Sequence, residues 1–248
     1  MNTIEAVTFD LWQTLVLDDR ELGRARTLLR LEKAKEALGG AGYDFSIDHL
    51  REAYRRCYRT CREVHNQERD LTFQEQVDTF ISYIDEGIEQ RLDGTVAEAI
   101  FHWYAEAFFD FPPQVAPEAL GVLEELKAKG YRLGMISNTG MTPGSLFRRY
   151  LAQHGILDQF QVLTFSDEVK LSKPSVEMFH MTLRALGTTS DRAVHVGDHI
   201  RNDVLGANRA GMRTVLLGAA EGQEPVADPH LRIGTLGELP QALAEMAG

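Results

Sequence analysis

The chain has 248 residues, 44% of them hydrophobic, which is enough for one large domain or two unequal ones. A net charge of −11 and a pI near 5.2 argue against polyanionic partners, so we expect neither nucleic acid nor a membrane surface to be bound. No signal-peptide pattern opens the chain and no run of about 18 apolar residues occurs, so we expect a cytoplasmic protein.

The first predicted element is an apolar strand at residues 4–9, which ends at the carboxylate of Asp10. From residue 18 to about residue 110, apolar side chains recur at spacings of three and four, which is the pattern of amphipathic helices. Breaks at residues 39–40, 70 and 93–94 divide this stretch and predict a bundle of about four helices. The strand has no neighbouring partner, so it most simply belongs to a sheet formed later in the chain.

The bundle contains the only two cysteines, Cys57 and Cys61, which are four residues apart. In a helix they share one face, and they are too few for a disulfide framework or, by themselves, for a zinc site. We interpret them as ordinary helix residues. Arg24, Arg26 and Arg30 could reach an anionic ligand from the first helix of the bundle, but we interpret most of them as a solvated face.

After residue 112 the pattern changes to short apolar runs that alternate with helices, the first helix running from Pro117 to Gly130. Alternation of this kind implies right-handed crossovers and a parallel sheet buried on both faces. The predicted fold class is α/β: a Rossmann-like core at residues 1–17 and 112–248, with a helical domain inserted at residues 18–111. The predicted strands of this second part are residues 132–137, 161–165, 193–196 and 214–217.

Polar residues follow the predicted strands, at the sheet edge where open parallel sheets bind ligands. Clustered carboxylates repel one another unless a divalent cation and a lysine balance their charge. Ligand atoms that are all oxygen point to magnesium as the divalent cation. The residues concerned are Asp10, Ser137, Asn138, Lys173, Asp198 and Asp203.

Four segments in this order resemble the motifs of the haloacid dehalogenase superfamily of hydrolases. They are F-D-L-W-Q-T-L at residues 9–15, M-I-S-N-T at 135–139, the lysine and proline of S-D-E-V-K-L-S-K-P at 166–174, and V-G-D-H-I-R-N-D at 196–203. The resemblance covers the whole predicted sheet, and the helical insertion resembles that family's first class of cap domain.

The resemblance implies a role for each matching residue. Asp10 would be a nucleophile that forms an aspartyl phosphate, and Lys173 would neutralise the charge shared with the phosphoryl group. The ligands of Mg²⁺ would be Asp10, the backbone carbonyl of Trp12 and Asp198, with Asp203 in support, directly or through water. The phosphoryl oxygens would be held by Thr14, Ser137 and the backbone amide of Asn138.

Trp12 departs from the pattern, because phosphatases of this family usually carry a second aspartate there. That aspartate protonates the leaving group and then activates water, and an indole can do neither. General acid and base catalysis is worth about 10²–10⁴ in rate. We therefore expect the general acid to be missing or relocated. His199, beside Asp198, is the first candidate to replace it, whereas we interpret His195, inside a predicted strand, as a core residue.

The sequence thus predicts a magnesium-dependent phosphatase that acts on a small phosphorylated metabolite. The alternative is a 2-haloacid dehalogenase, in which Asp10 displaces halide from carbon, because those enzymes also carry an aromatic residue two places after the nucleophile. The acidic pair at residues 198 and 203 argues against it. A third hypothesis is a catalytically weak binding or regulatory protein of the same fold. Substrate identity and oligomeric state stay open.

Overall fold

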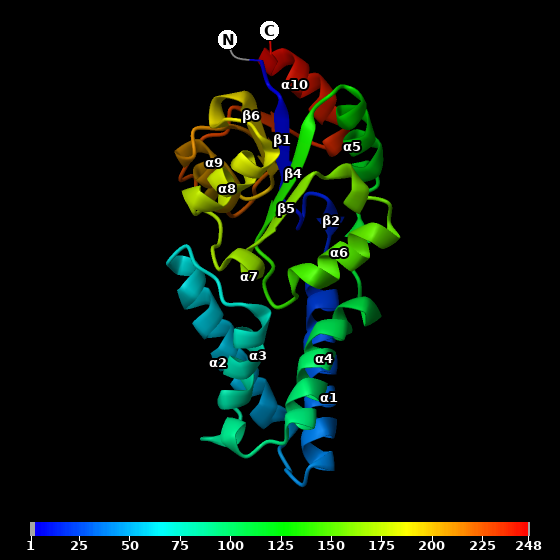
Figure 1. The fold of residues 1–248 in the computed structure, drawn as a ribbon, viewed down its shortest axis with the longest axis vertical. Helices are drawn as coiled ribbons and strands as arrows, with labels where there is room; N and C mark the ends of the chain where they lie inside the picture. Colours follow the sequence, from blue (N-terminus) through cyan, green and yellow to red (C-terminus); the bar gives the residue numbers. More distant parts are fainter. Residues whose placement is uncertain (1–2, 248) are drawn as a thin grey trace.

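A computed structural model describes residues 3–247, which form a sheet flanked by helices and a separate bundle of helices (Figure 1). Both ends of the described chain lie at the end of the sheet part that is farther from the bundle. No helix within residues 3–247 is both long enough and apolar enough to cross a membrane.

The described residues form one six-stranded sheet in the order β5-β4-β1-β6-β7-β8, and every neighbouring pair is parallel. The five strands expected from the sequence are confirmed to within two residues, which establishes the α/β class. A sixth strand was not predicted, because it has three residues and only one of them is buried. The strands are β1 (Ala6–Phe9), β4 (Arg132–Ser137), β5 (Val162–Phe165), β6 (Ala193–Gly197), β7 (Arg213–Leu217) and β8 (Leu231–Ile233).

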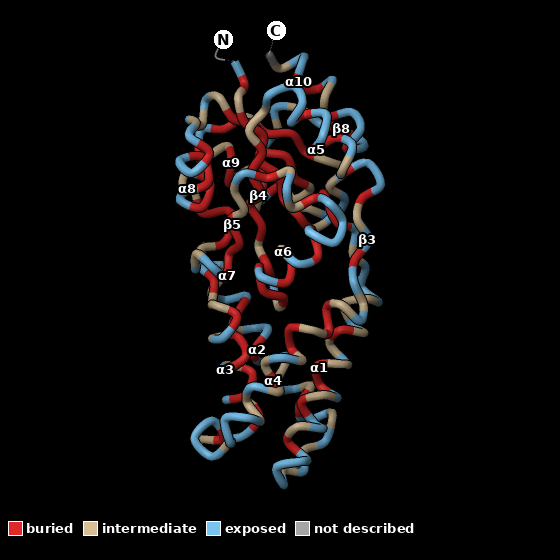
Figure 2. Tube along the Cα trace, turned by 45° about the vertical axis from the view of Figure 1, so that its right-hand side comes forward, coloured by how far each residue is buried: buried red, intermediate tan, exposed pale blue. Residues whose placement is uncertain are grey.

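Helices cover both faces of this sheet, because successive side chains of a strand point to opposite faces. Val7 and Phe9 belong to the larger apolar cluster, whereas Ala6 belongs to the smaller one. The β4 trace is accordingly buried along nearly its whole length (Figure 2), and all residues of β1 are buried. On one face lie α5 (Ala119–Ala128), α6 (Gly144–Gln153) and α10 (Leu239–Ala247), and on the other α8 (Val176–Leu186) and α9 (Gly206–Arg209), with the short α7 (Ser166–Val169) near the bundle.

The predicted bundle of about four helices is confirmed, with α1 packed along α4 and α2 against α3. Each helix begins where a short polar side chain accepts hydrogen bonds from backbone N–H groups of the first turn, which are otherwise without partners. These capping residues are Asp19, Ser46, Thr72 and Asp93. The helices are α1 (Arg20–Gly40), α2 (Ile47–Asn66), α3 (Phe73–Ser82) and α4 (Gly94–Asp110).

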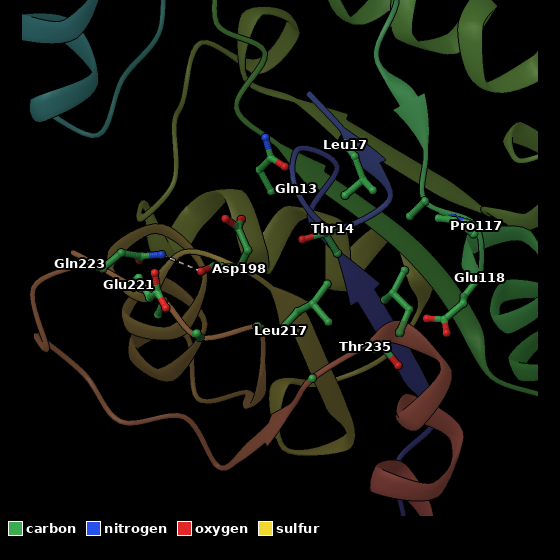
Figure 3. Close-up of a pocket in the computed structure, with 16 residues that line it drawn as sticks. Gln13, Thr14, Leu17, Pro117, Glu118, Asp198, Leu217, Glu221, Gln223 and Thr235 are labelled. Carbon is green, nitrogen blue, oxygen red and sulfur yellow. Dashed lines mark hydrogen bonds between the residues drawn. The ribbon is translucent and has the colours of Figure 1, made fainter. Parts of the chain in front are cut away.

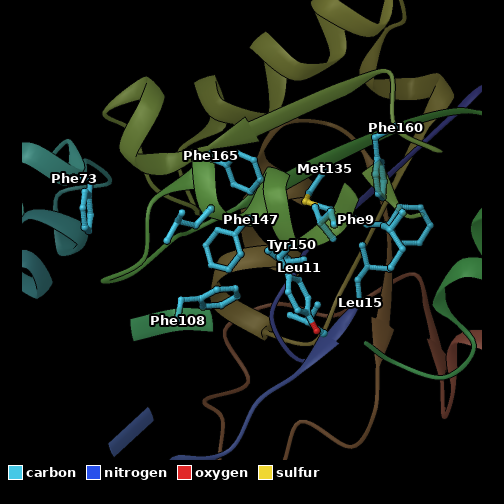
Figure 4. Close-up of a cluster of buried hydrophobic side chains, with 14 of the residues drawn as sticks. Phe9, Leu11, Leu15, Phe73, Phe108, Met135, Phe147, Tyr150, Phe160 and Phe165 are labelled. Carbon is cyan, nitrogen blue, oxygen red and sulfur yellow. The ribbon is translucent and has the colours of Figure 1, made fainter. Parts of the chain in front are cut away.

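The two connections between sheet and bundle run side by side as a small antiparallel pair, β2 (Val16–Leu17) and β3 (Gln114–Val115). Phe108, near the end of α4, packs on Phe147 of α6 with ring centroids 5.3 Å apart (Figure 4). The apolar core therefore continues from the sheet into the α1–α4 half of the bundle.

Candidate active site

The carboxyl edge of the sheet brings together residues that follow three neighbouring strands. β1 lies between β4 and β6 in parallel register, so the chain leaves all three strands at the same edge. Asp10 follows β1, Ser137 ends β4 and Asp198 follows β6. Residues almost 190 positions apart in the chain thus meet through strand pairing.

Lys173 links two acids of this group. Its Nζ donates to Asp10 Oδ1 and to Asp203 Oδ1, at 2.6 Å in each case, and its side chain is buried. A buried charge is tolerated when partners of opposite charge surround it. With Asp198 the group holds three carboxylates and one ammonium, so a net charge of about −2 is left when all are ionised.

Asp203 is held from several sides. His195 Nε2 lies 3.2 Å from Asp203 Oδ1, and the His199 backbone N–H donates to Oδ2 at 2.9 Å. His195 in turn lies 2.9 Å from the Thr8 hydroxyl through Nδ1. Asp203 itself lies in a six-residue π-helical turn, Ile200–Leu205, a rare conformation that is frequent at functional sites. The interpretation of His195 as a core residue is confirmed, and the structure adds its contact with Asp203.

The carboxylates differ in how well the protein supports their charge. Burial raises the pKa of Asp10 to about 7 despite the opposing effect of Lys173, and burial raises the pKa of Asp198 to about 6. Burial also opposes the charge of Asp203, but Lys173 and His195 outweigh it and hold its pKa below the usual range. Asp10 and Asp198 therefore need a further cation to stay ionised, and Asp203 does not.

The geometry of the three acids fits Mg²⁺. Carboxylate oxygens of Asp10, Asp198 and Asp203 lie within 4.8 Å of one another. Magnesium takes oxygen ligands at about 2.0–2.1 Å in an octahedron, so oxygens on one ion are separated by about 3–4.2 Å. Because both oxygens of Asp203 already accept hydrogen bonds, this residue is better suited to orienting the site than to direct ligation.

Gly197 permits this arrangement because it has no side chain. A Cβ placed there would lie 2.4 Å from the Asp203 carboxylate, far inside van der Waals contact. We expect Gly197→Ala to displace Asp203, to cost about 1–3 kcal/mol in the free energy of unfolding, and to weaken Mg²⁺ binding.

Urea unfolding and calorimetric titration with Mg²⁺ measure these two effects. Gly121→Ala in α5 is the matched control, because its Cβ meets no atom within 4 Å. This control should be neutral or more stable by about 0.5–1 kcal/mol. Unchanged Mg²⁺ affinity in Gly197→Ala would show that Asp203 does not depend on the glycine.

The residues expected to hold phosphoryl oxygens lie at the carboxyl ends of β1 and β4 or just beyond them. The Asn138 side chain accepts from the Lys173 backbone N–H at 2.8 Å and donates to its carbonyl at 3.2 Å, so it also positions the lysine. The buried Thr14 hydroxyl has no hydrogen-bond partner among residues 3–247 and is available to a ligand. The Ser137 hydroxyl donates to the Asn138 carbonyl at 3.3 Å.

Two cavities border these residues. One, of about 460 Å³, is lined by Gln13, Thr14 and Asp198 and by the loop after β7 (Figure 3). From that loop Gln223 donates to the Asp198 carbonyl at 2.9 Å and accepts from the Ile200 N–H at 2.7 Å. Gln223 thereby fixes the turn that carries Asp198. Nothing in its sequence context indicates this role, because it lies in an irregular loop.

The second cavity, of about 370 Å³, lies between the bundle and the sheet. Trp12 lines it, half-buried, with its ring edge-to-face on Phe147 at 5.1 Å. The bundle contributes Arg26 and Arg30, which are buried, so the expectation of a solvated arginine face was wrong for both and holds only for Arg24. They are buried because their guanidinium groups are bonded to groups at the junction with the sheet part.

Those bonds explain what each arginine does. Arg26 donates to the Phe111 carbonyl at 2.7 Å and pairs with Asp18, so it joins the two connections between bundle and sheet. Arg30 donates to the Tyr104 carbonyl at 2.7 Å and to the Thr142 hydroxyl at 3.1 Å. Helical periodicity could not reveal these partners, because all of them except Asp18 lie more than 70 residues away.

The fold is a Rossmann-like parallel sheet with a bundle of helices inserted after its first strand. Its carboxyl edge presents a carboxylate, a buried lysine and an acidic pair. Together these features define the class of protein as a hydrolase. A family model described as haloacid dehalogenase-like hydrolase matches residues 4–211. The chain belongs to this family of hydrolases.

Curated relatives include phosphatases. The chain is 30% identical over 98% of its length, and over 99% of the relative, to a glyceraldehyde 3-phosphate phosphatase from Methanopyrus kandleri. It is 41% identical to the enzyme of that name from Methanothermobacter thermautotrophicus and 36% identical to a phosphoserine phosphatase from Thermus thermophilus. Those two matches span 43% and 54% of the relatives, or about half of their length, and 41% and 54% of this chain.

Solved structures of both chemistries share the fold. A 2-haloacid dehalogenase from Pseudomonas syringae pv. Tomato DC3000 is 28% identical with a TM-score of 0.70, over 99% of this chain and all of that one. A haloacid dehalogenase-family phosphatase from Thermococcus onnurineus is 25% identical with a TM-score of 0.65, over 97% and 98%.

Proposed function

We propose that the protein is a magnesium-dependent phosphatase that hydrolyses a small phosphorylated metabolite through an aspartyl phosphate on Asp10. The observation that carries this proposal is the grouping of Asp10, Asp198 and Asp203 around one buried lysine, with Asp10 and Asp198 poorly supported as anions. Displacement at phosphorus by a carboxylate brings two anions together, so it gains most from a cation at this place. The named phosphatases among the relatives support the same chemistry.

In the first step an Asp10 oxygen attacks phosphorus, the bond to the ester oxygen breaks, and the leaving oxygen takes up a proton. Thr14 and Ser137 hydroxyl groups and the Asn138 amide bind the phosphoryl oxygens, and Lys173 neutralises Asp10 and the transferring group. Water then attacks phosphorus, which releases phosphate and restores the carboxylate. Bound Mg²⁺ would supply positive charge to the phosphoryl oxygens and the nucleophile, held by Asp10, Asp198 and the carbonyl of Trp12.

We further propose that residues 18–111 act as a cap that shields the site from water and selects the substrate. The cavity between bundle and sheet, about 370 Å³, has the volume of a small-metabolite site. The paired strands β2 and β3 and the Arg26 contacts place both connections in one narrow junction. A junction of this kind allows the bundle to move as a unit against residues 1–17 and 112–248.

A second candidate is 2-haloacid dehalogenase activity, favoured by the aromatic ring of Trp12 and by the solved dehalogenase of the same fold. One screen separates the two: phosphoesters and 2-haloacids, each with Mg²⁺ or with a chelator. Phosphate release that needs Mg²⁺ supports the proposal. Halide release that is indifferent to the chelator overturns it in favour of the dehalogenase, and no release from either class favours a binding or regulatory protein.

Removal of Asp198 is expected to abolish the dependence on Mg²⁺. In Asp198→Ala the oxygen ligands left in the protein are too few to hold the ion against water, so we expect phosphate release at saturating Mg²⁺ to fall by about 10²-fold or more. Rates measured against Mg²⁺ concentration test this. Asp44→Ala, an exposed acid of the bundle, is the control. A normal rate in Asp198→Ala with the usual Mg²⁺ dependence would place the ion elsewhere.

A further inference from the structure

Trp12 leaves a requirement of the proposed reaction unmet, because an alkoxide leaving group needs a proton that indole cannot give. A donor has to reach the cavity that Trp12 lines. Among the described lining residues, arginine stays protonated, so the candidates are the groups that exchange a proton more readily. They are Asp18, Tyr54, Tyr58, Cys61 and His65.

Most of these candidates are poorly suited. Asp18 is paired with Arg26, so the guanidinium group engages its carboxylate. Tyrosine ordinarily titrates near pH 10, which makes it a weak acid at neutral pH. A hydrogen bond from Cys57 lowers the pKa of Cys61 and favours its thiolate, which has no proton to donate. A histidine titrates near neutrality, and His65 is the histidine that lines this cavity.

His65 is paired with a buried carboxylate. Its Nε2 lies 2.8 Å from Asp70 Oδ1, and the Asp70 side chain is 0% exposed. Asp70 Oδ1 also accepts from the Leu71 N–H at 2.8 Å, but Oδ2 has no hydrogen-bond partner among residues 3–247. A buried carboxylate with so few hydrogen bonds requires a neighbouring cation. Burial opposes charge on the His65 ring, but Asp70 outweighs it and raises the pKa of His65.

The pair is also tied to the segment that carries Lys173. The Asp70 N–H donates to the Lys170 carbonyl at 3.2 Å, and the Ser172 N–H donates to the Glu68 carbonyl at 3.2 Å. The Ser172 hydroxyl donates to the carbonyl of His65 itself at 3.4 Å. Lys173 is the next residue. The α2–α3 loop thus places His65 relative to the lysine that holds Asp10.

His199, the first candidate for the general acid from the sequence, has a different role in the structure. Its Nδ1 accepts the Asn202 N–H at 3.2 Å and caps the turn that carries Asp203. It does not line the cavity beside Trp12. His65, by contrast, lines that cavity, and charge rather than a hydrogen bond holds its ring beside Asp70, because Nε2 has no hydrogen-bond partner among residues 3–247.

We propose that His65, paired by charge with Asp70, is the general acid that protonates the leaving oxygen, in place of the carboxylate that Trp12 replaces. This rests on the proposed phosphatase function. As the bond between phosphorus and the leaving oxygen breaks, the proton passes from the His65 imidazolium to that oxygen, and the ring becomes neutral. The neutral ring then accepts a proton from the water that attacks the aspartyl phosphate, which restores the imidazolium and releases phosphate.

His65→Gln tests the proposal with a series of aryl and alkyl phosphates at saturating Mg²⁺. Aryl leaving groups depart without a proton, so kcat/KM for them should change little, whereas kcat/KM for alkyl phosphates should fall by about 10²-fold. Asp70→Asn should show the same selective loss in weaker form, because the ring remains but is less readily protonated. His102→Gln, an exposed histidine of α4, is the control.

A second variant separates chemistry from folding. In His65→Ala, added imidazole should restore hydrolysis of alkyl phosphates, which a purely structural role of His65 does not predict. Equal losses on aryl and alkyl substrates, or no loss, with Asp10-dependent hydrolysis intact, would overturn the role of His65 and leave the proposed function standing. If no phosphoester is hydrolysed in an Asp10-dependent way, the proposed function and this inference fall together.

Discussion

Replacement of Asp10 by asparagine is expected to abolish phosphoester hydrolysis, by about 10⁴-fold or more, because an amide keeps the shape of the carboxylate but cannot attack phosphorus. The fold should survive the change. Burial already raises the pKa of Asp10 to about 7, so the ionised carboxylate contributes little to stability there, and Lys173 keeps Asp203 as a partner. We expect the free energy of unfolding to change by less than about 1 kcal/mol.

The measurement is phosphate release by purified wild type and variant, with denaturant unfolding of both. Asp44→Asn, on the exposed surface of the bundle, controls for loss of a charge. A trapped acyl phosphate on wild type that is missing from Asp10→Asn would identify the attacked residue directly. Activity retained by a folded Asp10→Asn would rule out covalent catalysis by this side chain.

Replacement of Trp12 by aspartate is expected to return an acid and base to the position where the family usually has one. The increase in turnover should be larger for alkyl than for aryl phosphates, and it should depend on whether His65 is present. In a His65→Gln background we expect alkyl phosphate turnover to rise by up to about 10²-fold, and in the wild-type background by less, because His65 already supplies the proton. A shared function of this kind predicts non-additive effects of the two changes.

Two contacts of Trp12 bear on this result. Its ring packs on the ring of Phe147, with the two ring centroids 5.1 Å apart. The substitution should therefore lower the free energy of unfolding by up to about 3 kcal/mol. The Arg26 guanidinium lies 6.0 Å from the same ring, and a new carboxylate could pair with it instead of reaching the substrate. Rate profiles against leaving-group pKa for the wild type, both single variants and the double variant decide the matter. No gain in either background, in stable protein that binds Mg²⁺, would show that Trp12 does not stand where the acid is needed.

Much of the site follows from local sequence because catalytic groups in parallel sheets lie at strand ends. Three apolar runs are predicted as strands, and they end at or just before Asp10, Ser137 and Asp198. The pairing of these strands alone brings the three residues to one edge of the sheet. The acidic and basic residue types then indicate a metal and a balancing lysine. The distances of 2.6 Å from Lys173 to Asp10 and Asp203 agree with that expectation.

Other parts of the site depend on contacts between distant segments. Arg26 and Arg30 share a face of α1 with the buried Ala34 and Leu38, but their charge favours a solvated position. Only the contacts with Phe111, Tyr104 and Thr142 account for their burial. Gln223 lies in an irregular loop and acts on a turn 25 residues earlier in the chain.

The sequence by itself determined the class of fold, the candidate catalytic edge and the anomaly at Trp12, because hydrophobic periodicity and residue type are properties of short segments. Only the tertiary structure decided which polar groups from the bundle meet that edge. His65 has no distinguishing feature in its predicted helix, and Asp70 is only a predicted break between helices. They become a candidate acid and its partner because the α2–α3 loop is hydrogen-bonded to residues 170 and 172. Such contacts depend on the packing of elements about 100 residues apart in the chain. The periodicity within each of the two segments does not encode that packing.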